Sequence, residues 1–135
     1  MPAPHRFDIR VYYEDTDAGG VVYYANYLKF TERARTEWLR AIGVDHGALR
    51  EDHGLIFVVA RIDARYRRPA RLDDLLTVET VVNAIGAARV TLAQTALRDG
   101  EILFDSKVDV ALIDFETGRP ARAPAALNAK LRAEV

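Results

Sequence analysis

NYLKFTERARTEWLRA, residues 26–41, decides the fold, because its apolar side chains recur with the period of an α-helix. The apolar stripe falls at i, i+3, i+7, i+11 and i+14 and consists of Tyr27, Phe30, Ala34, Trp38 and Ala41. Charged side chains occupy the opposite face. Asn26 is the expected N-cap and Gly43 the expected C′ residue. The pattern predicts an amphipathic helix roughly 25 Å long that buries one face.

Strand-like segments lie on both sides of this helix. Upstream, residues 7–14 alternate apolar and polar side chains and run into the turn-forming stretch 15–20. After a polar connection over 44–54, strands are predicted over 55–67, 75–85, 89–98 and 101–113, and Pro124 can start a short terminal helix. Successive strands joined by short turns favour an antiparallel sheet. The sequence therefore predicts an α+β fold with one long helix on an antiparallel sheet.

The bulk composition is that of an ordinary globular protein. The chain has 135 residues, which predicts a single domain over 1–135, and its net charge of −1 disfavours nucleic acid as a partner. It has no cysteine, which excludes disulfides, cysteine nucleophiles and thiolate metal sites. The N-terminus has no apolar stretch of signal-peptide length, and the longest apolar run, 55–60, is too short to insert in a membrane. We therefore expect a cytoplasmic protein.

The chemistry is concentrated in residues 13–27, YEDTDAGGVVYYANY. Carboxylates, two glycines and several tyrosines lie between a strand end and a helix start, where unpaired backbone N–H groups are available. A carboxylate beside such donors suits acyl transfer: it attacks or activates water while the N–H groups hold the oxyanion. An acidic, glycine-containing loop before a helix is, however, usually a solvated turn with a cap. Spacing alone leaves both interpretations open.

Other reactive motifs are excluded by spacing. A calcium loop starting at Asp15 would have Gly19 at its fifth position and Asn26 where a bidentate glutamate is needed. The three histidines, His5, His46 and His53, show no metal-ligand spacing, and the only serine, Ser106, lies within a predicted strand. No phosphate-binding glycine loop is present. These spacings therefore predict no metal site.

Five arginines lie along the second predicted strand and in the segment just after it. They are Arg61, Arg65, Arg67, Arg68 and Arg71. Charges along a strand discourage unwanted edge pairing, and they also anchor phosphorylated ligands such as coenzyme A.

Three segments resemble the YbgC-type acyl-CoA thioesterases of the 4-hydroxybenzoyl-CoA thioesterase group, which have the hotdog fold. They are VYYEDTDAGGVVY at 11–23 with ANY at 25–27, ERARTEWLR at 32–40, and PARLDD at 69–74. The likeness covers most of the chain. It implies a five-stranded antiparallel sheet wrapped around one long helix, and an enzyme that hydrolyses acyl-CoA to free acid and CoA. It also implies that no metal or tightly bound cofactor is needed.

The resemblance also implies residue roles. Asp17 matches the catalytic aspartate, a nucleophile or a general base on water, with the oxyanion held by backbone N–H groups around Tyr24 and Ala25. The implied substrate-binding residues are Tyr13, Gly19, Gly20, Val21, Tyr24, Ala25 and Asn26. The candidate CoA anchors are Arg65, Arg68 and Arg89. Family members are dimers and usually homotetramers, with active sites at subunit interfaces.

Two departures from the family pattern bear on the substrate. Many members carry histidine where this chain has Tyr24, and an aromatic side chain there favours aryl or bulkier acyl groups. The hairpin at 83–89 has only Arg89 as a basic residue, which makes an acyl carrier protein the alternative acyl donor. A hotdog hydratase is disfavoured because no histidine lies near Asp17 in sequence. The remaining alternative is a non-catalytic module that binds acyl-CoA or acyl carrier protein.

Overall fold

A computed structural model of the chain describes residues 3–135 and contains the predicted strands and helices in the predicted order, with one further α-helix over His46–His53. The strands are β1 (His5–Arg10), β2 (Leu55–Tyr66), β3 (Leu75–Ile85), β4 (Arg89–Arg98) and β5 (Glu101–Asp114). The α-helices are α1 (Asn26–Ala41), α2 (His46–His53) and α3 (Ala125–Arg132), and residues Tyr13–Asp15 form a short 3-10 turn.

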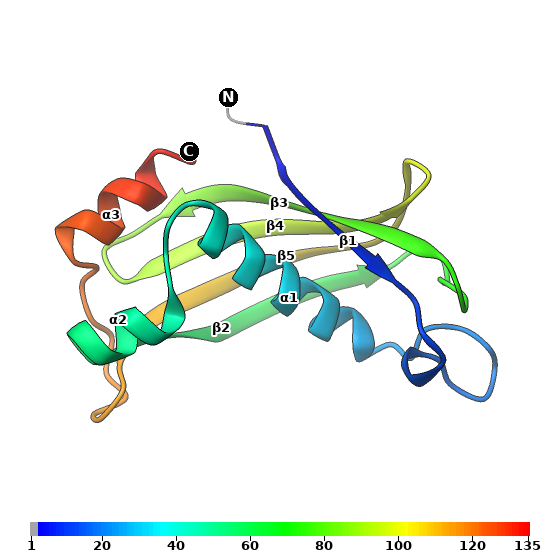
Figure 1. Cartoon of the computed structure of the whole chain (residues 1–135), viewed down its shortest axis with the longest axis horizontal. Helices are drawn as coiled ribbons and strands as arrows, with labels where there is room; N and C mark the ends of the chain where they lie inside the picture. The colour runs from blue at the N-terminus through cyan, green and yellow to red at the C-terminus, as the bar shows by residue number, and fades with distance from the viewer. Residues whose placement is uncertain (1–2) are drawn as a thin grey trace.

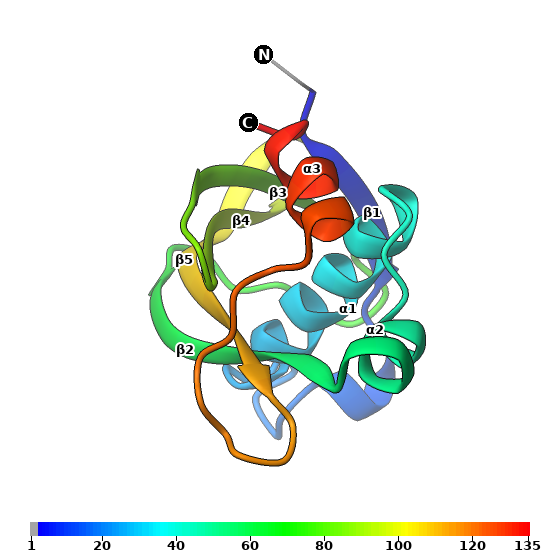
Figure 2. The same ribbon diagram turned by 90° about the vertical axis from the view of Figure 1, so that its left-hand side faces the viewer.

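The strands form one five-stranded sheet in the order β1-β3-β4-β5-β2, and every neighbouring pair is antiparallel. Figures 1 and 2 show this sheet curling around α1, with α3 near one end of the layer. The predicted α+β architecture, a sheet wrapped around one long helix, is therefore confirmed. Strands β1 and β2 are the two edges of the sheet.

Two apolar clusters fill the space between helix and sheet. One surrounds Trp38 and Leu39 from the second half of α1, together with Leu127 and Leu131 of α3. The other surrounds Tyr27, Phe30 and Ala34 from the first half of α1, together with β1 and β3. The helix stripe is buried as predicted except for Ala41, which is exposed in the last turn of α1.

The C-terminal end of α1 is as predicted, whereas its N-terminal end is not. Gly43 is the expected C′ residue: its φ is +86°, its N–H bonds Arg40 O at 3.0 Å, and Val44 N–H bonds Leu39 O at 2.8 Å. The N-cap is Ala25, however, and Asn26 is the first helical residue, with its side chain used elsewhere. The prediction of Asn26 as the N-cap is therefore wrong.

Other boundaries follow the sequence closely, with two differences. The first strand ends at Arg10, before the 3-10 turn, although alternation continues to residue 14. The polar connection contains helix α2, which Asp45 caps by accepting a hydrogen bond from Ala48 N at 3.0 Å. Within residues 3–135, no helix is long and apolar enough to cross a membrane.

Candidate active site

Asp17 lies on an exposed, tightly hydrogen-bonded turn between β1 and α1. Residues Thr16 and Val22 form an antiparallel bridge, and Asp17 N–H donates to Val21 O at 2.9 Å. At the tip, Gly20 has φ +78° and donates to Asp17 O at 3.0 Å. The turn presents Asp17 to solvent on a defined backbone.

The Asp17 carboxylate is itself held by the turn. Its Oδ1 accepts a hydrogen bond from Gly19 N at 2.9 Å. A Cβ at residue 19 would lie 3.2 Å from that oxygen, so the glycine leaves room for the carboxylate to sit close to the backbone. One carboxylate oxygen is thus oriented, and the other remains available for chemistry.

Asp15 anchors the same segment from the buried side and is only 5% exposed. Its Oδ1 accepts from Asn26 Nδ2 at 2.9 Å, and its Oδ2 accepts from Tyr12 N at 2.8 Å. Its carbonyl oxygen accepts from Tyr23 N at 2.9 Å. Asn26, which the sequence places among the substrate-binding residues, is therefore buried and bonded to the turn. The role of Asp15 was not predicted, because an extended chain would place the side chains of residues 15 and 17 on the same face. The 3-10 turn at Tyr13–Asp15 breaks this alternation, so that Asp15 is buried while Asp17 is exposed.

Backbone N–H groups without a protein acceptor, including those of Tyr24 and Ala25, lie where the described chain enters α1. Tyr23 N and Asn26 N have backbone acceptors, Asp15 O and Tyr23 O. Within residues 3–135, neither the Tyr24 N–H nor the Ala25 N–H donates a hydrogen bond to a protein acceptor. They stand at the positive end of the α1 dipole, a suitable place for an anionic oxygen.

An aromatic cluster adjoins these N–H groups. Tyr66 at the end of β2 donates its hydroxyl to Tyr24 O at 2.8 Å, and its ring lies 5.5 Å from the Tyr27 ring. Beside them is a cavity of about 290 Å³, and its lining residues are Val22, Tyr24, Tyr27, Tyr66, Arg67, Arg68 and Pro69. The entrance to α1 therefore borders an aromatic hollow with two arginines at its rim.

The tyrosine pKa values reflect this crowding. The pKa of Tyr23 is raised, first by the charge and hydrogen bonding of Tyr24, then by burial and by the negative charge of Asp17. Burial raises the pKa of Tyr66. These phenols remain neutral hydrogen-bond donors at physiological pH.

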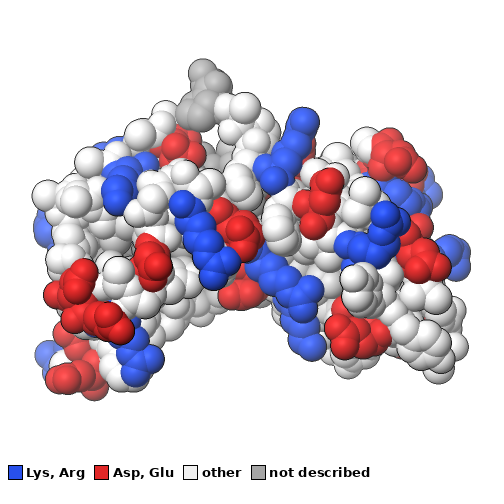
Figure 3. Space-filling model, viewed as in Figure 1, with Lys and Arg blue, Asp and Glu red and all other residues white. Residues whose placement is uncertain are grey.

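The three candidate CoA anchors do not meet within one chain. Arg65 and Arg68 lie at the end of β2 near the Asp17 turn, and Arg68 forms an ion pair with Glu101 at 3.2 Å. Arg89 begins β4 at the opposite end of the sheet and lies 3.6 Å from Asp109. On the face drawn in Figure 3, basic and acidic side chains are interspersed, without a broad field of one sign.

The remaining predicted site residues lie on or near the turn. Tyr13 is 83% exposed in the 3-10 turn, Gly19 and Gly20 are exposed at the tip, and Val21 is half-buried. Across residues 3–135, no three histidine, aspartate or glutamate side chains are grouped so that they could hold a metal ion.

Comparisons with known proteins match nearly the whole chain. A family model described as the thioesterase-like superfamily matches residues 11–131. The acyl-CoA thioesterase YbgC of Haemophilus influenzae is 45% identical over 123 residues, which cover 91% of this chain and 90% of that protein. The acyl-CoA thioester hydrolase YbgC of Escherichia coli is 38% identical over 128 residues, covering 94% and 95%. A crystal structure of a probable thioesterase from Bartonella henselae superposes with a TM-score of 0.86 at 42% identity, covering 90% of this chain and 100% of that one.

Proposed function

From the premise that the chain belongs to the thioesterase-like superfamily, and there to the YbgC-type proteins, we propose that it hydrolyses acyl-CoA thioesters to the free acid and CoA. The observation that carries the proposal is an oriented, exposed carboxylate at Asp17 on the turn that leads into α1, together with N–H groups at Tyr24 and Ala25 that have no protein acceptor. That combination supplies the two elements an acyl-transfer site requires.

Asp17 acts on the thioester carbonyl carbon, while the N–H groups of Tyr24 and Ala25 stabilise the negative oxygen that forms. In the nucleophilic route, an Asp17 oxygen bonds to the carbonyl carbon, and collapse of the intermediate breaks the C–S bond. The CoA thiolate takes a proton from solvent, and water then hydrolyses the acyl–Asp17 anhydride. In the general-base route, Asp17 accepts a proton from the attacking water. Both routes use the same geometry.

A second copy of the chain completes the site. Strand β2 is an edge of the sheet, and Val59, Ile62 and Tyr66 on it are 49%, 37% and 48% exposed. If two β2 edges pair antiparallel, one chain's β3–β4 hairpin lies at the same end as the other chain's Asp17 turn. Arg89 of the second copy then approaches Arg65 and Arg68 of the first, where together they bind the CoA phosphates. The assembly is a dimer, or a tetramer made from two dimers.

The acyl group lies against the aromatic hollow beside Tyr24. Its tyrosine rings provide flat apolar surface, which favours aryl and bulkier acyl groups over short ones. Replacing Tyr24→His and finding the same ranking of acyl-CoA substrates would contradict this preference.

Free-thiol release from short, medium, long and aryl acyl-CoAs, and from matching acyl carrier proteins, tests the proposal. We expect wild-type turnover and a fall of about 10²–10⁴-fold in kcat for Asp17→Asn. Asp52→Asn, an exposed carboxylate change on α2, serves as the control. Activity that survives in Asp17→Asn would place the chemistry elsewhere. Tight binding of acyl-CoA without turnover of any substrate would favour a non-catalytic binding module.

A further inference from the structure

We propose that Asp74 and Arg98 are positioning residues for the Asp17 turn. The two side chains form a hydrogen-bonded ion pair that holds the connection 69–74 between β2 and β3. The backbone on each side of the Asp17 turn, at Val11 and at Val22 (the two stems of the turn), is hydrogen-bonded to that connection. The inference rests on the proposed function, since it concerns the geometry of that site.

The stems converge on one short piece of backbone. On the β1 side, Val11 N–H donates to Asp74 O at 2.9 Å, and Asp73 N–H donates to Val11 O at 3.0 Å. On the α1 side, Val22 N–H donates to Ala70 O at 2.8 Å, and a bridge joins Val21 to Arg71. The connection 69–74 is thus the platform from which the Asp17 turn projects.

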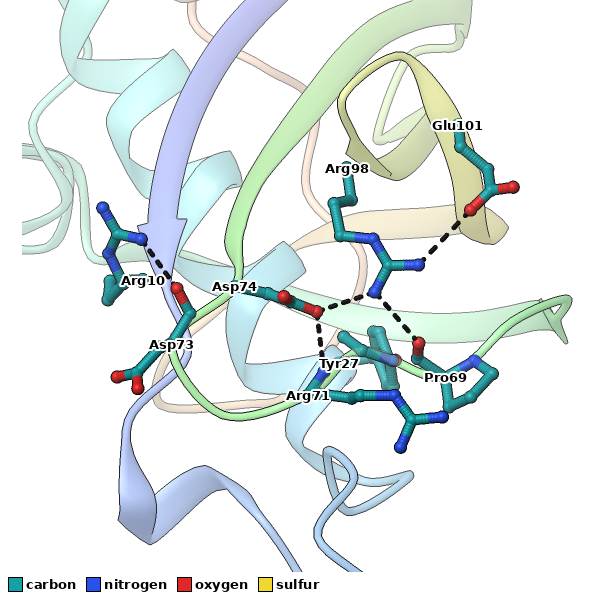
Figure 4. A network of polar contacts seen from close by, with 9 residues as sticks. Arg10, Tyr27, Pro69, Arg71, Asp73, Asp74, Arg98 and Glu101 are labelled. Atoms are coloured by element: carbon teal, nitrogen blue, oxygen red, sulfur yellow. Dashed lines mark hydrogen bonds and ion pairs between the residues drawn. The ribbon is translucent and has the colours of Figure 1, made fainter.

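A charged pair fixes the shape of this platform (Figure 4). Asp74 Oδ2 accepts hydrogen bonds from Arg98 Nη1 at 2.7 Å and from Arg71 N at 2.8 Å. Arg98 also donates to Pro69 O at 3.4 Å and to Glu101 Oε1 at 3.3 Å. The Asp74–Arg98 pair therefore ties both ends of the connection to the β4–β5 hairpin.

The same platform also reaches the oxyanion donors. Ala70 N–H donates to the hydroxyl of Tyr27 at 3.1 Å, and Tyr27 lies in the first turn of α1, just after Ala25. Asp73, with φ +71°, is held by Arg10, whose Nη1 donates to Asp73 O at 2.7 Å. The Asp17 turn and the start of α1 are thus both hydrogen-bonded to the connection 69–74.

Ionisation of Asp74 is favoured in this frame. Burial raises the pKa of Asp74, but the hydrogen bonds from Arg71 N–H and Arg98 and the charge of Arg98 outweigh it, and the pKa lies below its ordinary value. The pair is therefore charged throughout the neutral range. Since a displacement of about 1 Å in a reacting group can cost on the order of 100-fold in rate, the pair affects catalysis without touching substrate.

Steady-state kinetics on the full chain test this assignment. We expect Asp74→Asn and Arg98→Met each to lower kcat by about 10-fold or more while KM changes less than about 3-fold, with Arg98→Lys recovering part of the loss. The matched control is Glu79→Gln, which breaks the Arg6–Glu79 pair of 2.8 Å between β1 and β3 and should leave kcat unchanged.

The double variant Asp74→Asn/Arg98→Met makes the test independent of any general loss of stability. If the two residues act as one device, the double variant loses no more kcat than the worse single variant. Fully additive losses, or wild-type kcat in folded Asp74→Asn, would overturn the inference. Asp17→Asn in the same assay separates the two proposals: an inactive wild type contradicts the proposed function, whereas an Asp17-dependent activity that ignores Asp74 contradicts only the positioning role.

Discussion

Asp15 and Asp17 are two residues apart and have opposite environments. Asp17 is exposed with one oxygen bonded to Gly19, whereas Asp15 is buried and accepts three hydrogen bonds through its carboxylate and carbonyl oxygens. Composition and spacing single out the acidic turn, and the family resemblance singles out Asp17 within it. The use of Asp15 and Asn26 as an internal brace depends on the three-dimensional path of the turn, which no short pattern records.

Tyr27 gives a residue-level test of the brace between α1 and the platform. Tyr27→Phe removes only the hydroxyl that accepts Ala70 N–H, in a side chain that is 3% exposed. We expect a loss of about 1–3 kcal/mol in the free energy of unfolding, because the buried N–H is left without a partner. Urea unfolding measures it, with Tyr13→Phe, at 83% exposure, as the control. Equal stability of Tyr27→Phe and wild type would mean that water replaces the hydroxyl.

The lowered pKa of Asp74 predicts a pH dependence of stability. A carboxyl group with a folded-state pKa below its ordinary value of 3.8 stabilises the fold above that pH, and the contribution disappears as pH falls through the folded-state pKa. The stability difference between wild type and Asp74→Asn should therefore be largest near neutrality and shrink below about pH 4. Urea titrations from pH 7 to pH 3 measure it. A difference that stays constant down to pH 3 would show that the pair contributes through shape rather than charge.

At the scale of elements, the alternation of apolar and polar residues was enough to predict the boundaries of two strands. Strands β3 and β4 have their predicted boundaries because alternation begins and ends with them. Helix α2 was missed because its sequence, HGALREDH, has a glycine and a single buried residue, Leu49. The cap at Asp45 and the left-handed Gly54 at its end were the available signals. Gln94 on β4 is fully buried and bonds Thr31 and Arg35 of α1, a long-range link that sequence spacing does not reveal.

The end of α1 allows a direct test of its glycine. Gly43→Ala places a side chain at φ +86°, and its Cβ would lie 3.4 Å from Lys130 Nζ. We expect a loss of roughly 1–2 kcal/mol in the free energy of unfolding from the left-handed conformation. Gly86→Ala is the control, since it has ordinary Cβ contacts of 3.6 Å and no left-handed φ. Thermal and urea unfolding measure the stability of both variants. Equal stability of Gly43→Ala and Gly86→Ala would contradict the capping role of Gly43.

At the scale of the whole molecule, two features of the single chain would be explained by the presence of a second chain. The β2 edge exposes apolar side chains along its length, and Arg89 lies at the far end of the sheet from the Asp17 turn. Exposed apolar edges promote pairing with another chain. In the proposed dimer, the second copy covers the apolar β2 edge and brings its Arg89 to the other chain's Asp17 turn, so the proposal links assembly to activity.

Val59→Glu combined with Ile62→Glu tests this link, because it places four like charges where two β2 edges would meet. We expect the sedimentation coefficient to fall to that of a monomer and kcat/KM to fall by about 10-fold or more, since each site would lose its second arginine group. Val81→Glu, on β3 and separated from the β2 edge by β4 and β5, is the control and should keep the dimer, although a tetramer joined through the outer sheet face would be reduced to dimers by it. A variant that becomes monomeric and keeps full activity would show that one chain holds a complete site. In that case the CoA phosphates must be bound by Arg65 and Arg68 alone.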